Sequence, residues 1–84
     1  MNYLVTKTET TYRNGRLISN EISNWVIADE DVSFLEERLL QWHYLFQEDT
    51  KTWVRLGSKD YNGTDKQFFI TPITKTVNLF DIKL

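Results

Sequence analysis

The sequence predicts an α+β fold in which an antiparallel sheet of four to five strands packs on one helix. Segments rich in Thr, Val, Ile and Tyr, which favour strands, lie on both sides of a central segment whose apolar residues recur at helical spacing. Turn residues, including two Asn-Gly pairs, separate the strand-like segments. We therefore expect the order β-β-α-β-β, with a further C-terminal strand as the fifth.

The N-terminal third is predicted to be a long hairpin with strands over residues 3–13 and 16–27. Asn14-Gly15 between them favours a type I′ turn, because both residue types tolerate the positive φ that this turn requires. In the register of a two-residue turn, neither face of the hairpin is cleanly polar. We therefore expect a β-bulge between Ser19 and Asn24.

Asp29 to Gln47 is predicted to be an amphipathic helix. Its large apolar residues are spaced by four, three and four, at Leu35, Leu39, Trp42 and Phe46. Three successive acids at its start complement the positive end of the helix dipole, and Ser33-x-x-Glu36 has the form of a capping box. The N-cap is then Asp29, Asp31 or Ser33.

The C-terminal part is predicted to be sheet again, with strands over Thr50 to Gly57, Lys66 to Ile73 and Val77 to Leu84. The turn between the first two contains Asn62-Gly63. A three-residue loop with a bulge would avoid two like-charge pairs across this turn and would place Leu56 opposite Ile70.

Length and composition limit the classes of protein to which the chain can belong. Its 84 residues, 40% of them hydrophobic, predict a single domain over residues 1–84. The chain has no cysteine, which excludes disulfide-stapled scaffolds, thiolate metal sites and cysteine enzymes. Apolar runs fall far short of the roughly 20 residues of a membrane span, and Met1 to Thr10 lacks the pattern of a signal peptide. We therefore expect a cytoplasmic protein of a bacterial or a virus-infected bacterial cell.

The net charge of −2 is unevenly distributed along the chain. Residues 29–49 contain seven acidic residues and a single arginine, whereas residues 1–28 carry a net charge of +1 and residues 50–84 one of +3. Charge patterning of this kind bears on partners rather than on fold. The sequence therefore predicts an acidic helix on an otherwise weakly basic molecule.

Residues suited to catalysis are scarce. His43 is the only histidine and has no second ligand at metal-binding spacing. The serines lie in no nucleophile elbow, and the three glycines are too few for a phosphate-binding loop. We therefore expect a non-enzymatic protein with no catalytic residue, no cofactor and no metal site.

The helix carries the candidate binding surface. On a helical projection Leu40 and Tyr44 lie opposite the apolar side and are expected to face outward, surrounded by acids. An apolar centre ringed by charge suits a protein-binding surface. We expect this surface to comprise Glu36, Glu37, Leu40, Tyr44 and Glu48.

The resulting prediction is a small inhibitor or adaptor that presents its acidic helix to a basic, nucleic-acid-binding surface of a partner protein. A nuclease or a DNA-processing enzyme is the expected kind of partner. Small size, the acidic block and a Thr- and Asn-rich composition typical of AT-rich genomes favour a phage or mobile-element protein, including an anti-defence inhibitor.

Two alternatives remain open. Basic and aromatic residues interleave over the C-terminal strands and could bind single-stranded nucleic acid, with Lys51, Trp53, Arg55 and Lys66 as the binding set. Alternatively, Leu40 and Tyr44 are covered by the C-terminal strand or by a second copy of the chain, which would make the protein a structural homodimer.

Overall fold

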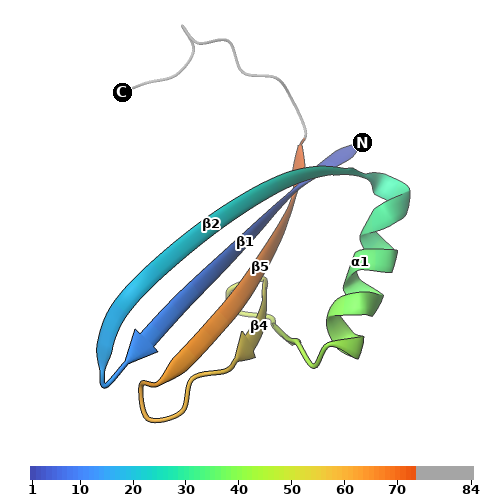
Figure 1. Cartoon of the computed structure of the whole chain (residues 1–84). Coiled ribbons are helices and arrows are strands. Elements are labelled where there is room, and N and C mark those ends of the chain that lie inside the picture. The colour runs from blue at the N-terminus through green and yellow to red at the C-terminus, as the bar shows by residue number, and fades with distance from the viewer. Residues whose placement is uncertain (74–84) are drawn as a thin grey trace, which may run out of the picture.

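The computed structural model describes residues 1–73 of the chain. Its elements, in chain order, are β1 (Asn2–Arg13), β2 (Arg16–Ala28), α1 (Asp29–Gln41), β3 (Leu45–Gln47), β4 (Thr52–Leu56) and β5 (Gly63–Ile73). The strands form one antiparallel sheet in the order β2-β1-β5-β4-β3 (Figure 1). The predicted α+β class is confirmed, and the fifth strand is β3. The strand predicted over Val77 to Leu84 lies outside the described residues.

β1 and β2 form the predicted hairpin. Asn14 and Gly15 have φ values of 51° and 79°, which confirms the predicted turn conformation. The bulge lies nearer the turn than we predicted: Tyr12 pairs with Leu17 and Thr11 pairs with Ser19, so Ile18 is the extra residue. Beyond the bulge the register is regular up to Asn2 and Ala28.

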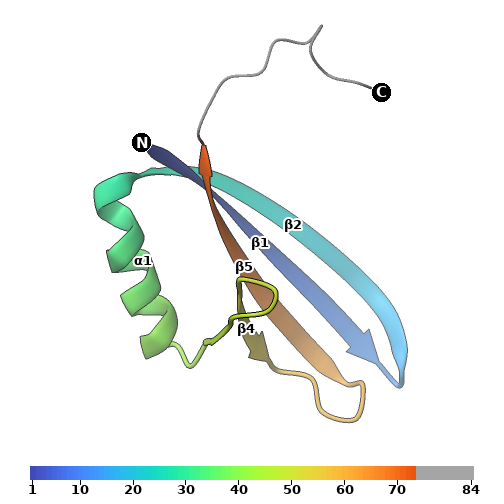
Figure 2. The same cartoon turned by 180° about the vertical axis from the view of Figure 1, so that it is seen from behind.

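The helix packs on one face of the sheet, here called the covered face (Figures 1 and 2). Residues opposite one another in register share a face, which places Val5, Ile70, Phe68 and Trp53 together on it. Leu39 of α1 packs against this row in the main core cluster. The other face, here called the open face, is covered by no helix of residues 1–73.

The helix begins where β2 ends. Ala28 is the N-cap and makes no side-chain capping bond, so none of the three residues predicted for this position occupies it. The backbone N–H of Asp29 instead donates a hydrogen bond to the carbonyl oxygen of Met1 at 3.1 Å. Tertiary structure thus satisfies one of the N–H groups of the first turn that have no partner within the helix. The three acids of the first turn are present as predicted.

The helix ends at Gln41, six residues before the predicted end. His43 adopts a left-handed conformation with φ 67°, and its N–H donates to the carbonyl oxygen of Leu40 at 3.1 Å. The N–H of Tyr44 donates to the carbonyl oxygen of Leu39 at 2.9 Å. These two bonds form a Schellman motif, which terminates a helix by turning the chain away from its axis.

This early end changes which aromatic residues are buried. Trp42, which we expected in the core, is 59% exposed, and Tyr44, which we expected on the surface, is only 6% exposed. Phe46 lies in β3, where it pairs with Trp53 of β4. The apolar spacing that predicted one long helix therefore extends over α1, the left-handed turn at His43 and the short strand β3.

The loop between β4 and β5 is longer than we predicted. Leu56 pairs with Asp65, not with Ile70, so the register differs from the predicted one by five residues, and six residues separate the two strands. It packs against the hairpin turn: the N–H of Gly15 donates to the carbonyl oxygen of Tyr61 at 3.1 Å, and the rings of Tyr12 and Tyr61 meet edge to face. The tight turn lies at Asp60 and Tyr61, whose φ values are 54° and 57°, and not at the predicted Asn62-Gly63, because Lys59 and Asn62 on either side exchange two backbone hydrogen bonds.

Candidate functional site

The solvent side of α1 displays two large apolar side chains with a carboxylate between them. Phe34 is 66% exposed and Leu40 is 58% exposed. At about 100° per residue, Glu37 projects midway between these two. Glu30 precedes Phe34 by one turn. We call Glu30, Phe34, Glu37 and Leu40 the outer helix surface; the exposed Trp42 lies beside it, at the C-terminal end of the helix.

The position of this surface follows from the burial of the opposite side of the helix. Leu39 is buried in the core cluster, and Leu35 packs against that cluster. The side of the helix that carries these two leucines therefore faces the sheet. Phe34 directly precedes Leu35, and Leu40 directly follows Leu39. Because successive residues of a helix are rotated by about 100°, both side chains point away from the sheet. Core packing therefore determines their exposure.

The electrostatics of α1 are strongly negative. The helix contains five acidic residues and one arginine. Within residues 1–73 the ion pairs are Lys7 with Glu9 and Lys51 with Glu48, neither of which involves a carboxylate of the helix. The negative charge of α1 is therefore not neutralised by a direct ion pair in the described part of the chain.

The five predicted partner-binding residues do not form one surface. Glu37 and Leu40 are exposed on α1 as expected. Glu36 is half-buried and lines a groove between helix and sheet. The expectation that Tyr44 faces outward is wrong, because the Schellman motif turns it into the core, where its ring meets Phe68 edge to face. Glu48 lies beyond β3, in the turn before β4.

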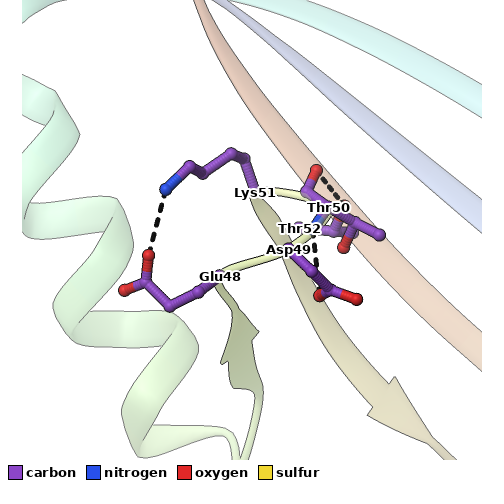
Figure 3. A network of polar contacts seen from close by, with 5 residues as sticks. All are labelled: Glu48, Asp49, Thr50, Lys51 and Thr52. Atoms are coloured by element: carbon purple, nitrogen blue, oxygen red, sulfur yellow. Dashed lines mark hydrogen bonds and ion pairs between the residues drawn. The ribbon is translucent and has the colours of Figure 1, made fainter.

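Glu48 belongs to the turn between β3 and β4 (Figure 3). Its carboxylate accepts a hydrogen bond from Nζ of Lys51 at 3.0 Å, and the N–H of Thr50 donates to Oδ1 of Asp49 at 3.0 Å. Lys51 holds a left-handed conformation with φ 55°. Glu48 and Lys51 are each more than 70% exposed, so their pairing is a surface interaction of small energy.

The groove between α1 and the sheet has a volume of about 400 Å³. Its lining is mainly apolar and aromatic, with one carboxylate and one ammonium group: Tyr3, Val32, Glu36, Phe46, Lys51, Trp53 and Ile70. The two charged groups have opposite signs, and the lining contains no pair of a catalytic nucleophile and a neighbouring base. The groove therefore has the character of a gap in packing beside the core.

The predicted nucleic-acid-binding set is also divided. Trp53 is 7% exposed beneath the helix, so it offers no ring for base stacking. Arg55 and Lys66 lie opposite one another on the covered face, beyond the end of the core cluster. Glu9 pairs with Lys66 on the same face. The basic residues are thus interleaved with acid and separated from the aromatic residue expected to act with them.

Glu9 forms an ion pair with Lys7 on the covered face. The hydrogen bond from Lys7 is the main cause that lowers the pKa of the Glu9 carboxyl, and Lys66 adds a smaller effect of the same sign. The carboxylate is therefore stabilised in its charged form. This pair reduces the positive potential that a phosphate backbone would need.

Sequence reasoning missed Glu30 and Phe34 of the outer helix surface, and it missed the exposure of Trp42 beside this surface. Phe34 could have been found, because a projection centred on Leu39 places it on the solvent side. The exposure of Trp42 could not have been found, because it depends on the helix ending just before His43, which adopts the left-handed conformation. Histidine is not the residue that usually marks such an end, a position where glycine predominates.

Residues 1–73 contain no group of three or more side chains suited to hold a metal ion. His43, the single histidine, contributes its backbone to the end of α1. No helix in the described part of the chain has the length and apolarity needed to cross a membrane.

No protein-family model matches the chain, and no curated protein or solved structure matches it.

Proposed function

We propose that this protein is a non-enzymatic binding module whose outer helix surface docks on a basic surface of a partner protein. The observation that carries the proposal is the exposure of Phe34, Leu40 and Trp42, each by more than half, on and beside an acidic helix. Exposed single apolar residues are ordinary, whereas three large ones around one short helix are a recognisable interaction surface.

The chemistry of the surface defines the kind of partner. Phenylalanine, tryptophan and leucine supply contact area, and the surrounding carboxylates favour Lys and Arg on the opposing side. Surfaces that bind nucleic acid are rich in these cations. The proposed partner is therefore a nucleic-acid-binding protein such as a nuclease, and the proposed effect is inhibition or recruitment in the manner of an anti-defence protein.

The proposal is tested with the full chain immobilised and exposed to a lysate of the host cell. A captured protein is purified and its affinity is measured for the wild type and for Phe34→Ala/Leu40→Ala. We expect the double variant to bind at least about a hundredfold more weakly, since central apolar contacts carry most of the binding energy. The matched control is Leu56→Ala, which removes an equally exposed leucine from β4.

Two results would contradict the proposal. One is a captured partner that binds both variants with wild-type affinity. The other is binding of a single-stranded oligonucleotide that disappears in Arg55→Ala/Lys66→Ala, which would assign function to the covered face. Competition between the partner and duplex DNA further tests whether the helix occupies the partner's nucleic-acid site.

A further inference from the structure

The edge strand β2 is long, and no strand of residues 1–73 pairs with its outer side. It spans 13 residues at one end of the sheet order, and residues 16–26 are all exposed. At about 3.3 Å per residue it presents backbone donors and acceptors over about 40 Å. In both views β2 forms the outer border of the sheet (Figures 1 and 2).

This edge carries few of the features that prevent strand pairing. Natural edge strands are protected by lysine, proline, charge or shortness. The opposite edge, β3, is only three residues long. In β2, between Leu17 and Ala28, Glu21 is the only charged residue, and the segment contains no lysine or proline. The bulge at Ile18 and the single charge of Glu21 are its protective features, and the bulge lies near the turn.

The open face of β2 carries an alternating row of Asn20, Ile22, Asn24 and Val26. The Asn24 carboxamide oxygen accepts a hydrogen bond from Oγ1 of Thr6 at 2.8 Å, and that of Asn20 accepts one from Thr10 at 3.4 Å. Both carboxamides are oriented by β1. Within residues 1–73 their N–H groups have no partner, so they are free to donate across the edge.

We propose that β2 pairs antiparallel with β2 of a second copy of this chain, around a two-fold axis through Ile22. In this arrangement Ile22 lies opposite its own copy, and Asn20 lies opposite Asn24. The two sheets become one, and each asparagine amide faces another amide. Pairing of this kind is isologous, so one strand supplies both sides of the interface.

The sequence of β2 favours this register over its neighbours. Moving the axis one residue to Glu21 would place two glutamates directly opposite each other, which is unfavourable. Moving it to Ser23 would place Ile22 opposite Asn24 and remove the apolar match. Of the axes at Glu21, Ile22 and Ser23, only the one at Ile22 pairs isoleucine with isoleucine and amide with amide along the same row.

Charge at the two ends of β2 is complementary under the same symmetry. At the turn end, Arg13 and Arg16 lie opposite each other in the strand register. The other end of β2 leads into the acidic first turn of α1. An antiparallel arrangement around Ile22 brings the turn end of one copy, with Arg16, near the start of α1 of the other copy, with Asp29. Basic and acidic groups therefore lie near one another at each end of the interface.

The first test is the mass of the full chain in solution. Sedimentation from micromolar to millimolar concentration should give twice the chain mass of 10.1 kDa, falling toward the single mass on dilution. A single mass at every concentration would overturn the proposal. That result is expected if residues 74–84 of the same chain cover the edge.

The second test places a charge at the axis. Ile22 is 62% exposed, so Ile22→Lys should leave the monomer folded while bringing two like charges together. We expect the dimer dissociation constant to rise at least tenfold. Leu56→Lys, a matched exposed aliphatic on β4, should leave it unchanged. Equal dissociation constants for the two variants would overturn the proposal.

The third test fixes the register by cross-linking, because the chain has no cysteine of its own. Directly opposite residues have Cα atoms about 4.5–5.5 Å apart, which is within the range of a disulfide. Ile22→Cys should therefore form a covalent dimer on mild oxidation. Val26→Cys should not, since its two copies would be about 26 Å apart along the strands. Equal cross-linking of both, or of neither, would contradict the register.

Discussion

Leu39 and Tyr44 are joined by a backbone hydrogen bond of 2.9 Å, and both side chains lie in the same core cluster. The bond runs from the N–H of Tyr44 to the carbonyl oxygen of Leu39 across the end of α1. A contact between these two side chains is the usual companion of a Schellman motif. The end of the helix and the burial of Tyr44 are therefore one structural event.

His43 should respond to substitution according to its left-handed conformation. His43→Val should lower the free energy of unfolding by about 1–2 kcal/mol, because a β-branched residue resists positive φ. His43→Gly should be neutral or slightly stabilising. Chemical denaturation provides the measurement. The control is Gln41→Val in the last turn of α1, and an equal loss for both valine variants would contradict the argument.

Tyr44 and Trp42 should differ sharply in their contribution to stability. Tyr44→Ala should cost about 3–5 kcal/mol, because it removes a ring from a small core. Trp42→Ala should change stability by less than about 0.5 kcal/mol, because the side chain is exposed. Urea denaturation of the two variants compares them directly. The opposite order would show that the helix continues past Gln41.

Stability should fall at alkaline pH through Tyr44. Burial raises the pKa of its phenol above the ordinary value of 10.0, so the folded state favours the neutral form. Stability from this group is complete below pH 10.0, and it is lost as pH rises from there through the folded pKa. The melting temperature of Tyr44→Phe should therefore decline less than that of the wild type above pH 10.0. Tyr61→Phe, an exposed tyrosine, should follow the wild type.

Gly57 should tolerate no side chain. A Cβ atom there would collide with the backbone carbonyl oxygen of Thr64, which cannot move without disturbing β5. Gly57→Ala should cost about 1–3 kcal/mol, as overpacking does. The neighbouring Ser58→Ala is the control, because the bond from Ser58 to Asp65 uses the backbone N–H. A silent Gly57→Ala would mean that the loop adopts another path.

The acidic residues of the outer helix surface should act mainly on the rate of association. Glu30→Lys/Glu37→Lys should slow binding to the captured partner, and the loss should shrink as salt rises, because exposed charges are screened over about 10 Å at 0.1 M. Stopped-flow mixing at several salt concentrations measures this effect. A loss that is independent of salt would indicate that these residues make buried contacts.

The strands and the acidic helix could be predicted because their signals are local. Asn14-Gly15 specifies its turn through the φ values of two residues, and the spacing of Leu35 and Leu39 specifies the buried side of α1. Both signals are confirmed in the structure. Phe34 and Leu40 follow from the same spacing, so most of the outer helix surface is readable from the sequence.

The end of the helix, the bulge and the β4–β5 loop could not be predicted because tertiary contacts decide them. His43 takes a conformation more typical of glycine, and Phe46 continues the helical spacing although it lies in a strand. The β4–β5 loop is held by Tyr61, whose carbonyl oxygen binds Gly15, a contact between residues far apart in sequence. Local sequence patterns do not show which distant residues will form such contacts.

The direct passage from β2 into α1, without a loop between Ala28 and Asp29, has a consequence for valency. Because no flexible linker separates β2 from α1, the helix keeps a fixed direction relative to its strand. In the proposed pairing around Ile22, the two helices would begin about 45 Å apart, at about 3.3 Å per residue along the strands. A partner that repeats its basic patch at this spacing would be held by both helices, and the second contact would form at a high effective concentration. Avidity would then depend on the stiffness of one peptide junction.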